Sequence, residues 1–184
     1  DADTSLELQA IVDAVNASIS AAIDVIEAYA DDNNNPTPNV SHYADAGVDG
    51  VNADNLAQVN AAIDALDATS ADTAREIQAV VNAVIALNMI QDYADDNSNP
   101  APTISDFDAA GITGVDADNI ATVNAAIDAL VGDDVNSVEK IQAIVNQVNN
   151  DAALAEILED SNSVAGSNNL NGVPVTVEQL TMVS

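Results

Sequence analysis

The chain repeats itself at an interval of 64 residues, and no other feature constrains its fold as strongly. Residues 53–66 (ADNLAQVNAAIDAL) return at 117–130 (ADNIATVNAAIDAL) with twelve of fourteen positions identical. Residues 43–51 (YADAGVDGV) return at 107–115 (FDAAGITGV). Self-similarity at a fixed interval is the signature of a repeat architecture, in which each repeat is one structural module. We therefore expect the chain to be an array of similar modules.

A long apolar segment opens each module. DTSLELQAIVDAV at 3–15 is matched by DTAREIQAVVNAV at 72–84 and by NSVEKIQAIVNQV at 136–148. The interval between the first two is 69 residues, because the first segment carries five extra residues. The third copy continues to NLNGVPVTVEQL at 169–180, which resembles the proline-containing loop and the short segment that follows it. The predicted boundaries are 1–68 for the first module, 69–132 for the second and 133–184 for a truncated third.

Three helices are expected in each module: a long one, a short one and one of medium length. The short helix runs from Val40 to Ala46, since Gly47 supplies the residue favoured just past a helix end. The medium helix follows Asn52, which can cap it. In the long helix, apolar residues recur at three-four spacing and define one face. That face is Leu8, Ile11, Val12, Val15, Ile19, Ala22, Ile26 and Tyr29. The predicted fold class is all-α, with tandem three-helix bundle modules.

The charge balance excludes several classes of partner. The chain carries 31 acidic residues against two basic ones, a net charge of −29. A surface this acidic repels the phosphates of nucleic acids, so no nucleic-acid partner is expected. No run of 18 apolar residues occurs, and we expect no membrane insertion. Aromatic residues make up only 2% of the chain, which predicts a thin aliphatic core. The aromatic residues expected to pack in that core are Tyr29, Tyr43, Tyr93 and Phe107.

Enzymatic activity is not expected from the residues present. The sequence has no cysteine, and its single histidine, His42, is replaced by Asp106 in the next module. A catalytic base is not expected to change identity between two copies of one module. None of the short motifs for phosphate binding, serine hydrolysis or zinc proteolysis occurs. We therefore predict a non-enzymatic protein without a catalytic site.

The acidic loop DDNSNPAPTISD at 95–106 is the strongest candidate for a ligand site. A helix-flanked calcium loop takes oxygen ligands from positions 1, 3, 5, 7, 9 and 12, the seventh through a backbone carbonyl. The loop departs from that pattern at position 6, where Pro100 replaces the glycine that makes the sharp turn. The candidate calcium ligands are Asp95, Asn97, Asn99, Ala101 (through its carbonyl), Thr103 and Asp106.

The first copy of the loop is DDNNNPTPNVSH at 31–42, and it offers a smaller set of ligands. Asp31, Asn33 and Asn35 are present, but His42 stands in place of the final carboxylate, so weaker calcium binding is expected here. Both loops also fit a purely structural role, because Asp and Asn favour turns and proline prevents a helix from continuing. The sequence leaves open whether the loops are helix stop signals or calcium sites.

The combination of EIQAVVNAV, YADDNNNPTP, YADAGVDGV and NADNLAQVNAAIDAL resembles the tandem helical repeats of very large bacterial surface proteins and adhesins. It is most similar to GA-like modules, three-helix bundles akin to the albumin-binding modules of streptococcal surface proteins. The resemblance covers nearly the whole chain. It implies an extracellular protein attached to the cell surface and built of many such modules, which are neighbours in one chain.

Two hypotheses of function follow. In the first, the modules form a non-enzymatic spacer or stalk of an adhesin, which projects a distal binding domain and is kept soluble and extended by its charge. Calcium bound in the proline loops would stiffen the joints of this spacer. In the second, each module binds an extracellular protein ligand through one helix face. The polar residues Asn60 and Asp64 recur as Asn124 and Asp128, and they are the candidates for such a shared face.

Overall fold

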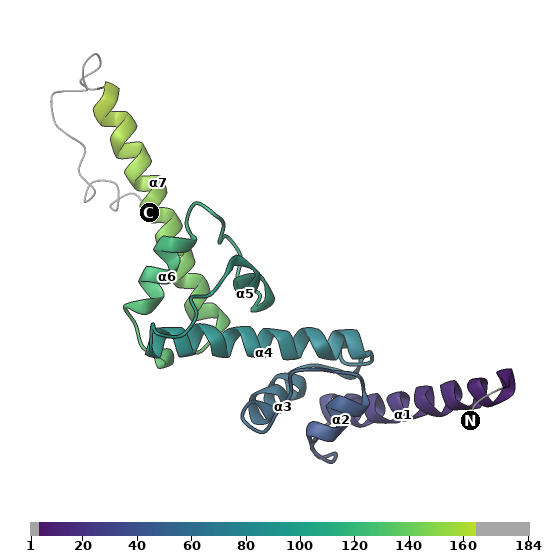
Figure 1. Ribbon diagram of the computed structural model, residues 1–184. Coiled ribbons are helices and arrows are strands. Elements are labelled where there is room, and N and C mark those ends of the chain that lie inside the picture. Colours follow the sequence, from purple (N-terminus) through teal and green to yellow (C-terminus); the bar gives the residue numbers. More distant parts are fainter. Residues whose placement is uncertain (1–3, 165–184) are drawn as a thin grey trace. The chain divides into compact units, whose positions relative to one another are not determined.

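The computed structural model describes residues 4–164, with side chains to residue 158. All regular secondary structure in this range is helical, which confirms the all-α class (Figure 1). The expected third-copy match at 169–180 lies outside the described residues. The elements, in order, are α1 (Ser5–Asp31), α2 (Val40–Asp45), α3 (Leu56–Asp64), the 3₁₀ helix η1 (Ala68–Ser70), α4 (Ala74–Asp95), α5 (Ile104–Ala109), α6 (Ile120–Asp128), the 3₁₀ helix η2 (Gly132–Val135) and α7 (Val138–Val164).

Backbone contacts group the chain into two compact units. Among the described residues, the first comprises 4–89 and 105–111, and the second comprises 90–104 and 112–164. Within the first unit, α1 contacts α2, α3 and η1. Within the second unit, α7 contacts α6 and η2. The helix lengths follow the repeat in the sequence, because α2 and α5 have six residues each and α3 and α6 have nine each.

Side-chain caps explain where α1 and α4 begin. The Thr4 hydroxyl accepts a hydrogen bond from the Glu7 N–H, while the Glu7 carboxylate accepts one from the Thr4 N–H. In α4 the Glu76 N–H donates to the Thr73 hydroxyl, which in turn donates to the Glu76 carboxylate. These contacts satisfy backbone donors that the first turn of a helix leaves without partners. Both long helices therefore begin at the same position of the repeat.

The medium helix α3 begins at Leu56 rather than directly after Asn52, because a turn fills residues 53–55. The Asn52 Oδ1 accepts hydrogen bonds from the N–H groups of Asp54 and Asn55 at 2.8 and 3.3 Å. The Asn55 Oδ1 accepts one from the Asn52 N–H at 2.9 Å. Asn52 is thus a capping residue, but the segment that it caps is a turn ahead of the helix.

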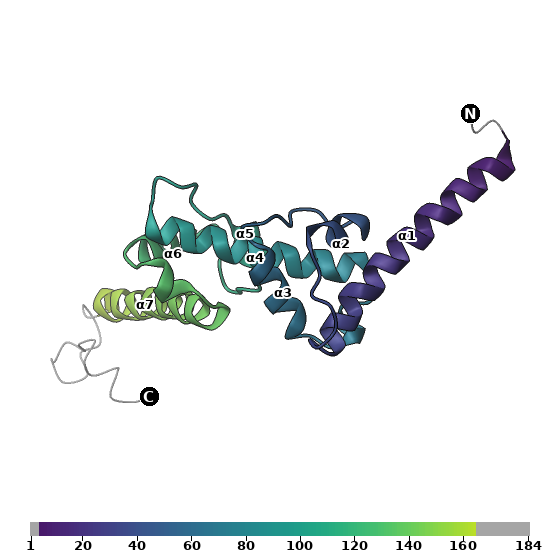
Figure 2. The same cartoon turned by 90° about the horizontal axis from the view of Figure 1, so that it is seen from below.

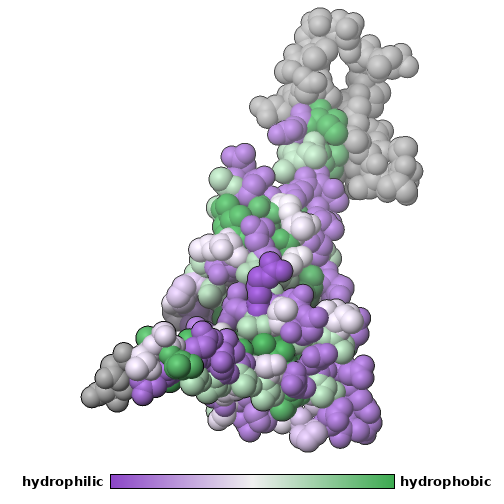
Figure 3. Space-filling view, turned by 90° about the vertical axis from the view of Figure 1, so that its right-hand side faces the viewer, coloured by the Kyte–Doolittle hydropathy of each residue, from purple (hydrophilic) through white to green (hydrophobic). Residues whose placement is uncertain are grey.

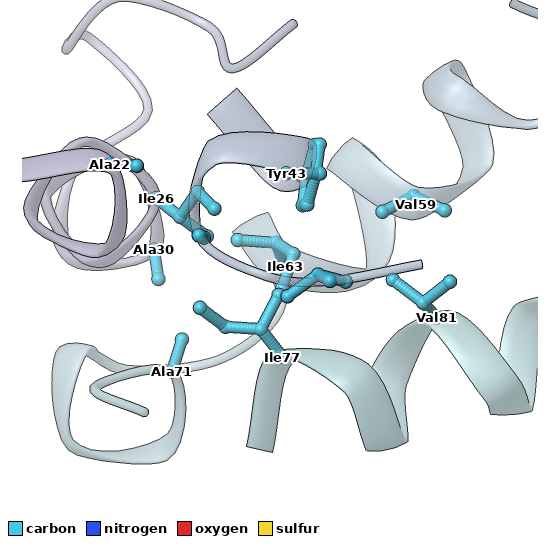
Figure 4. Close-up of a cluster of buried hydrophobic side chains, with 11 residues drawn as sticks. Ala22, Ile26, Ala30, Tyr43, Val59, Ile63, Ala71, Ile77 and Val81 are labelled. Carbon is cyan, nitrogen blue, oxygen red and sulfur yellow. The ribbon is translucent and has the colours of Figure 1, made fainter. Parts of the chain in front are cut away.

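The core of the first unit is formed by α1, α2, α3 and the beginning of α4 (Figure 4). Apart from one tyrosine it is aliphatic. Burial of each valine- or isoleucine-sized side chain stabilises the fold by about 1.5–3 kcal/mol relative to exposure. The buried residues are Ala22, Ile26, Ala30, Tyr43, Ala46, Val48, Val59, Ile63, Ala71, Ile77 and Val81. Because Ile77 and Val81 belong to α4, the first unit uses the next long helix to complete its core.

One buried polar bridge joins α2, α3 and the proline loop. Tyr43 is fully buried, and its hydroxyl donates to the Asn60 Oδ1 at 2.6 Å. The Asn60 side-chain amide donates to the Pro38 carbonyl at 2.9 Å. Burial raises the pKa of the Tyr43 hydroxyl, and nearby Tyr29 raises it further. The prediction that Tyr43 packs in the core is confirmed, and its hydroxyl lies inside the core as well.

The first half of α1 is exposed, although the sequence predicted that its apolar face lies in the core. Only the second half of the face, around Ile26, is buried. The beginning of α1 extends beyond α2 and α3 in both ribbon views (Figures 1 and 2). The exposed large apolar side chains of this half are Leu6, Leu8, Ile11, Val12 and Val15, with exposed fractions between 49% and 82%. The helical period correctly indicated an apolar face, but half of that face has no cover among the described residues.

The same helix bears on the expectation that the chain does not insert into a membrane. By length and composition α1 is apolar enough to cross a membrane, since it contains an 18-residue window with at most two charged residues. Core helices of soluble proteins and signal sequences meet the same criterion, so the criterion alone is weak evidence for a membrane span. α1 therefore meets the criterion although it contains no uninterrupted run of 18 apolar residues.

Tyr43→Phe tests the buried bridge. The substitution keeps the ring, removes the hydroxyl and leaves the Asn60 Oδ1 buried without its donor. A buried acceptor without a partner costs about 1–3 kcal/mol, and we expect the free energy of unfolding in chemical denaturation to fall by that amount. Tyr29→Phe is the control, because Tyr29 is only partly buried, and its effect should stay within about 0.5 kcal/mol. Equal effects of the two substitutions would contradict the role of the bridge.

Candidate functional site

The first proline loop closes the end of α1 with its own side chains. The Asp32 carboxylate accepts a hydrogen bond from the Asn34 N–H at 3.0 Å, and the Asn35 N–H donates to the Asp32 carbonyl at 2.9 Å. The Asn35 side-chain amide donates to the Ala28 carbonyl at 2.8 Å. That carbonyl belongs to the last turn of the helix and also accepts a hydrogen bond from the Asp32 N–H at 3.1 Å, so the Asn35 amide is a second donor to it. The loop therefore forms a turn and caps the helix end.

The second loop repeats these contacts. The Asp96 carboxylate accepts from the Ser98 N–H at 2.9 Å, and the Asn99 side-chain amide donates to the Asp92 carbonyl at 2.9 Å. Hydrogen bonds from the Ser98 backbone, and then from its side chain, lower the pKa of Asp96. Because the pKa is lower in the folded state, this contribution to stability is present at neutral pH. It is lost as the pH falls through the pKa of the folded carboxyl.

Two of the candidate calcium ligands stand at the beginning of the short helix. In the first module, the Asn39 Oδ1 accepts from the N–H groups of Ser41 and His42. The His42 Nδ1 accepts from the Asn39 N–H at 3.1 Å, which completes a capping box. Thr103 and Asp106 occupy the same two positions before and within α5, and threonine followed three residues later by an acid is a capping pattern. A capping role accounts for both His42 and Asp106.

Asp95, the first candidate ligand, is bonded to η2. Its Oδ1 accepts a hydrogen bond from the Gly132 N–H at 2.6 Å. A Cβ on Gly132 would lie 2.7 Å from the Asp95 Oδ2, so a side chain at this position would displace the Asp95 carboxylate. In the first module the aligned residues are Asp31 and Ala68. Ala68 carries the methyl group that Gly132 lacks, and the hydrogen bond from the Gly132 N–H to Asp95 has no counterpart between Ala68 and Asp31 among the contacts of the first loop described here.

The candidate ligands thus lie at successive positions of a helix-to-helix connection. Asp95 ends α4, Asn99 caps its last turn, and Thr103 precedes α5. Among residues 4–164, no group of three or more His, Cys, Asp or Glu side chains is placed to hold a metal ion. The remaining candidates are Asn97 and Ala101 within the second loop, Asp106 in α5, Asp31 at the end of α1, and Asn33 and Asn35 in the first loop. The contacts favour the helix-stop interpretation, and calcium binding stays a prediction.

A second recurring arrangement holds the beginning of a long helix against a glycine turn. In the first unit, the Gln78 side chain of α4 accepts from the Asp49 N–H at 2.7 Å and donates to the Asp49 carbonyl at 3.0 Å. Gly50 has a φ of +90°, and a Cβ on it would lie 2.8 Å from the Ile85 Cδ1 and 3.7 Å from Val81. Glycine suits this turn because it adopts positive φ and allows close approach. We call this contact the glycine-turn junction.

The second unit has the same junction between α7 and the turn at Gly114. The Gln142 side chain accepts from the Thr113 N–H and donates to the Thr113 carbonyl, each at 2.9 Å. Gly114 has a φ of +82°. Its carbonyl accepts hydrogen bonds from the side-chain amides of Asn119 at 2.7 Å and Asn149 at 2.9 Å. Each unit therefore fastens a turn to the next long helix through uncharged amides.

Asn60 and Asn124 were predicted to lie on a shared exposed face, and the other amides that make internal contacts were not predicted. Their signal was available, because the same amide residue stands at the same place in both repeats. The recurring pairs are Asn55 and Asn119, Asn60 and Asn124, and Gln78 and Gln142. For these amides, recurrence in both repeats therefore indicated an internal contact.

One amide differs between the repeats. The Asn124 side chain donates to the Pro102 carbonyl at 2.9 Å, as Asn60 does to Pro38. Its Oδ1, however, is buried and has no hydrogen-bond partner among the described residues. The residue aligned with Tyr43 is Phe107, which is fully buried and carries no hydroxyl. The second repeat thus contains, by nature, the chemistry that Tyr43→Phe would introduce into the first.

Comparison of the chain with protein-family models, curated proteins and solved structures returned no match. Functional inference therefore rests on the residues and contacts described above. The most informative of these are the two proline loops and the two glycine-turn junctions.

Asp95→Ala tests the contact between α4 and η2. The substitution removes a carboxylate that accepts a short hydrogen bond from the Gly132 N–H. Hydrogen bonds to charged groups contribute about 1.5–3 kcal/mol, and partial exposure reduces this, so we expect a loss of about 1–2 kcal/mol in chemical denaturation. Asp31→Ala is the matched control in the first loop, with an expected change within about 0.5 kcal/mol. A loss of equal size in both variants would show that the Gly132 contact is not the cause.

Thermal melting with calcium and with a chelator, at matched ionic strength, tests the two interpretations of the loops. The helix-stop interpretation predicts coinciding curves, because the carboxylates of Asp32 and Asp96 accept hydrogen bonds from their own loops and that of Asp95 accepts one from Gly132. The calcium interpretation predicts a rise in Tm with calcium that Asp106→Asn reduces, since that substitution removes a carboxylate ligand. We expect coinciding curves. A calcium-dependent rise abolished by Asp106→Asn would overturn the helix-stop interpretation.

Proposed function

We propose that the chain is a set of tandem three-helix modules that acts as a spacer or stalk in an extracellular bacterial surface protein. The observation that supports this most directly is the use of the recurring polar residues. Gln78 and Gln142 hold glycine turns, and Asn55 and Asn119 brace those turns from within. These recurring amides thus make contacts within a unit or with the next long helix. Such contacts are expected in an array whose repeats stabilise one another.

The acidic surface supports the same proposal. With a net charge of −29, the chain repels copies of itself and resists collapse onto other acidic surfaces. Such repulsion is screened within about 8 Å at physiological ionic strength, so it acts between near neighbours. A stalk benefits from this, because neighbouring stalks on one cell surface stay separate.

The second candidate is a module that binds an extracellular protein. Of the two recurring residues that suggested a shared face, Asn60 is buried and bonded to Tyr43 and Pro38. Its recurrence is explained by packing. Asp64 is exposed and recurs as Asp128, which is the remaining observation in favour of a shared binding face.

X-ray scattering of chains of different length tests the spacer. Further copies of residues 69–132 are inserted after residue 132, one at a time, so that the repeat register is kept. A spacer predicts that the maximum particle dimension grows by a constant amount for each copy. Growth that levels off would show a collapsed assembly and would contradict the proposal.

Pull-down of serum and matrix proteins on the immobilised chain tests the second candidate. The spacer predicts no saturable capture. The binding module predicts capture that is lost when Asp64→Ala and Asp128→Ala are combined, because the two residues share one exposed position of the repeat. Capture unaffected by that pair would have to use a different surface.

A further inference from the structure

The first half of α1 carries the side chains that the other long helices use at their glycine-turn junctions. At matching positions stand an aliphatic residue, a glutamine directly after it, a valine three residues later, and a fourth residue one turn beyond. These residues are Leu8, Gln9, Val12 and Asn16 in α1, Ile77, Gln78, Val81 and Ile85 in α4, and Ile141, Gln142, Val145 and Asn149 in α7. We call the α1 set the α1 face.

The three helices differ in what covers these positions. The aliphatic pair is fully buried in α4 and in α7, whereas Leu8 is 54% exposed and Val12 is 49% exposed. The glutamine in α4 and in α7 bonds to the backbone of a glycine turn, whereas Gln9 donates to Asp13 of its own helix at 2.8 Å. Green apolar residues are visible at the surface on the beginning of α1 (Figure 3). The α1 face therefore has the long-helix side chains of a glycine-turn junction, but no glycine turn packs against it among the described residues.

We propose that the α1 face docks a further unit of the same repeat through that unit's glycine turn and medium helix. The occupant has the pattern of residues 43–70 or 107–134, in which a turn with a positive-φ glycine precedes a nine-residue helix. Gln9 bonds to the backbone of the residue before the glycine, and Asn16 donates to the glycine carbonyl as Asn149 does to Gly114. The inference rests on the tandem modules of the proposed function.

The polar members of the α1 face favour a repeat unit over a lipid surface. Gln9 and Asn16 lie on the same face as Leu8 and Val12, and their counterparts in α7 bond to a protein backbone. A bilayer core offers no such partners, and placing unsatisfied amides in it costs several kcal/mol. The helical propensity and capping box of Thr4 and Glu7 also hold this half of α1 in the docking conformation without a partner.

A second copy of the same chain fits the face less well than a further repeat unit does. The turn at Gly50 is occupied by α4, with Val81 and Ile85 against the glycine. The turn at Gly114 is occupied by α7, with Val145 and Asn149 against it. Neither turn is available to another molecule unless its own junction opens first.

The test adds a further copy of residues 1–69 ahead of Asp1 in the full chain. Ser70 follows residue 69 in the repeat and aligns with Asp1, so the added turn and medium helix keep the spacing found before α4. Backbone hydrogen exchange is compared between the extended and the original chain. We expect exchange at residues 6–16 of the original α1 to slow markedly in the extended chain, because docking buries that face.

Leu8→Ser combined with Val12→Ser, in the α1 that follows the added copy, is the matched variant. In the extended chain the pair should lower Tm by roughly 5 °C or more, because it removes two buried aliphatic side chains. In the original chain, where both positions are half exposed, the pair should have a clearly smaller effect. Unchanged exchange, together with equal effects of the pair in both chains, would overturn the inference.

Three further outcomes would assign the α1 face to another occupant, and each of them would also overturn the inference. The first is protection of residues 6–16 in the original chain that disappears when residues 165–184 are removed. The second is binding of the original chain to phosphatidylcholine vesicles that the serine pair abolishes. The third is a concentration-dependent dimer that the serine pair abolishes. Failure of the inference would leave the scattering test of the spacer unaffected, because that test measures growth with copy number and not contacts of α1.

Discussion

The close approach of a glycine turn to the side of a long helix is the contact on which the rest of each unit depends. Small aliphatic side chains cover little area, so a core built from them needs backbones that come near one another. Gly50 and Gly114 allow this, because both have positive φ and leave no Cβ between the turn and the helix. With the turn in place, the isoleucine and valine on the facing helix are completely buried.

Uncharged amides carry the polar contacts that join one element to another in this very acidic chain. Asn60 bridges a tyrosine hydroxyl and a proline carbonyl, while Gln78 and Gln142 each pair with both backbone groups of one turn residue. An amide can donate and accept at once, and it loses less hydration free energy on burial than a carboxylate does. The acids are left to turns, helix starts and the exposed faces. Folding of the core therefore depends little on the charges that dominate the surface.

The elements that follow local rules were predictable from the sequence. Gly47, the proline loops and the apolar spacing correctly predicted where α2 lies and that the class is all-α. The contacts between elements were less predictable. Apolar periodicity identifies a helix face, but it does not show whether another element covers that face. Leu8 and Val12 follow the period and are about half exposed. In the same way, an acidic Asn-Pro loop satisfies the ligand count of a cation site and the chemistry of a helix stop equally well until its hydrogen bonds are known.

The module boundaries drawn from the sequence repeat do not coincide with the ends of the hydrophobic core. The core of the first unit continues past residue 68 to Ile77 and Val81, so a module boundary drawn at residue 68 divides that core. Every window of 64 residues nevertheless contains each position of the glycine-turn junction once, because each of these positions has a counterpart one period later. A gene for such an array can gain or lose whole periods at any breakpoint and still encode matching surfaces on both sides. Recombination can therefore change the length of the array even when its breakpoints lie inside a module.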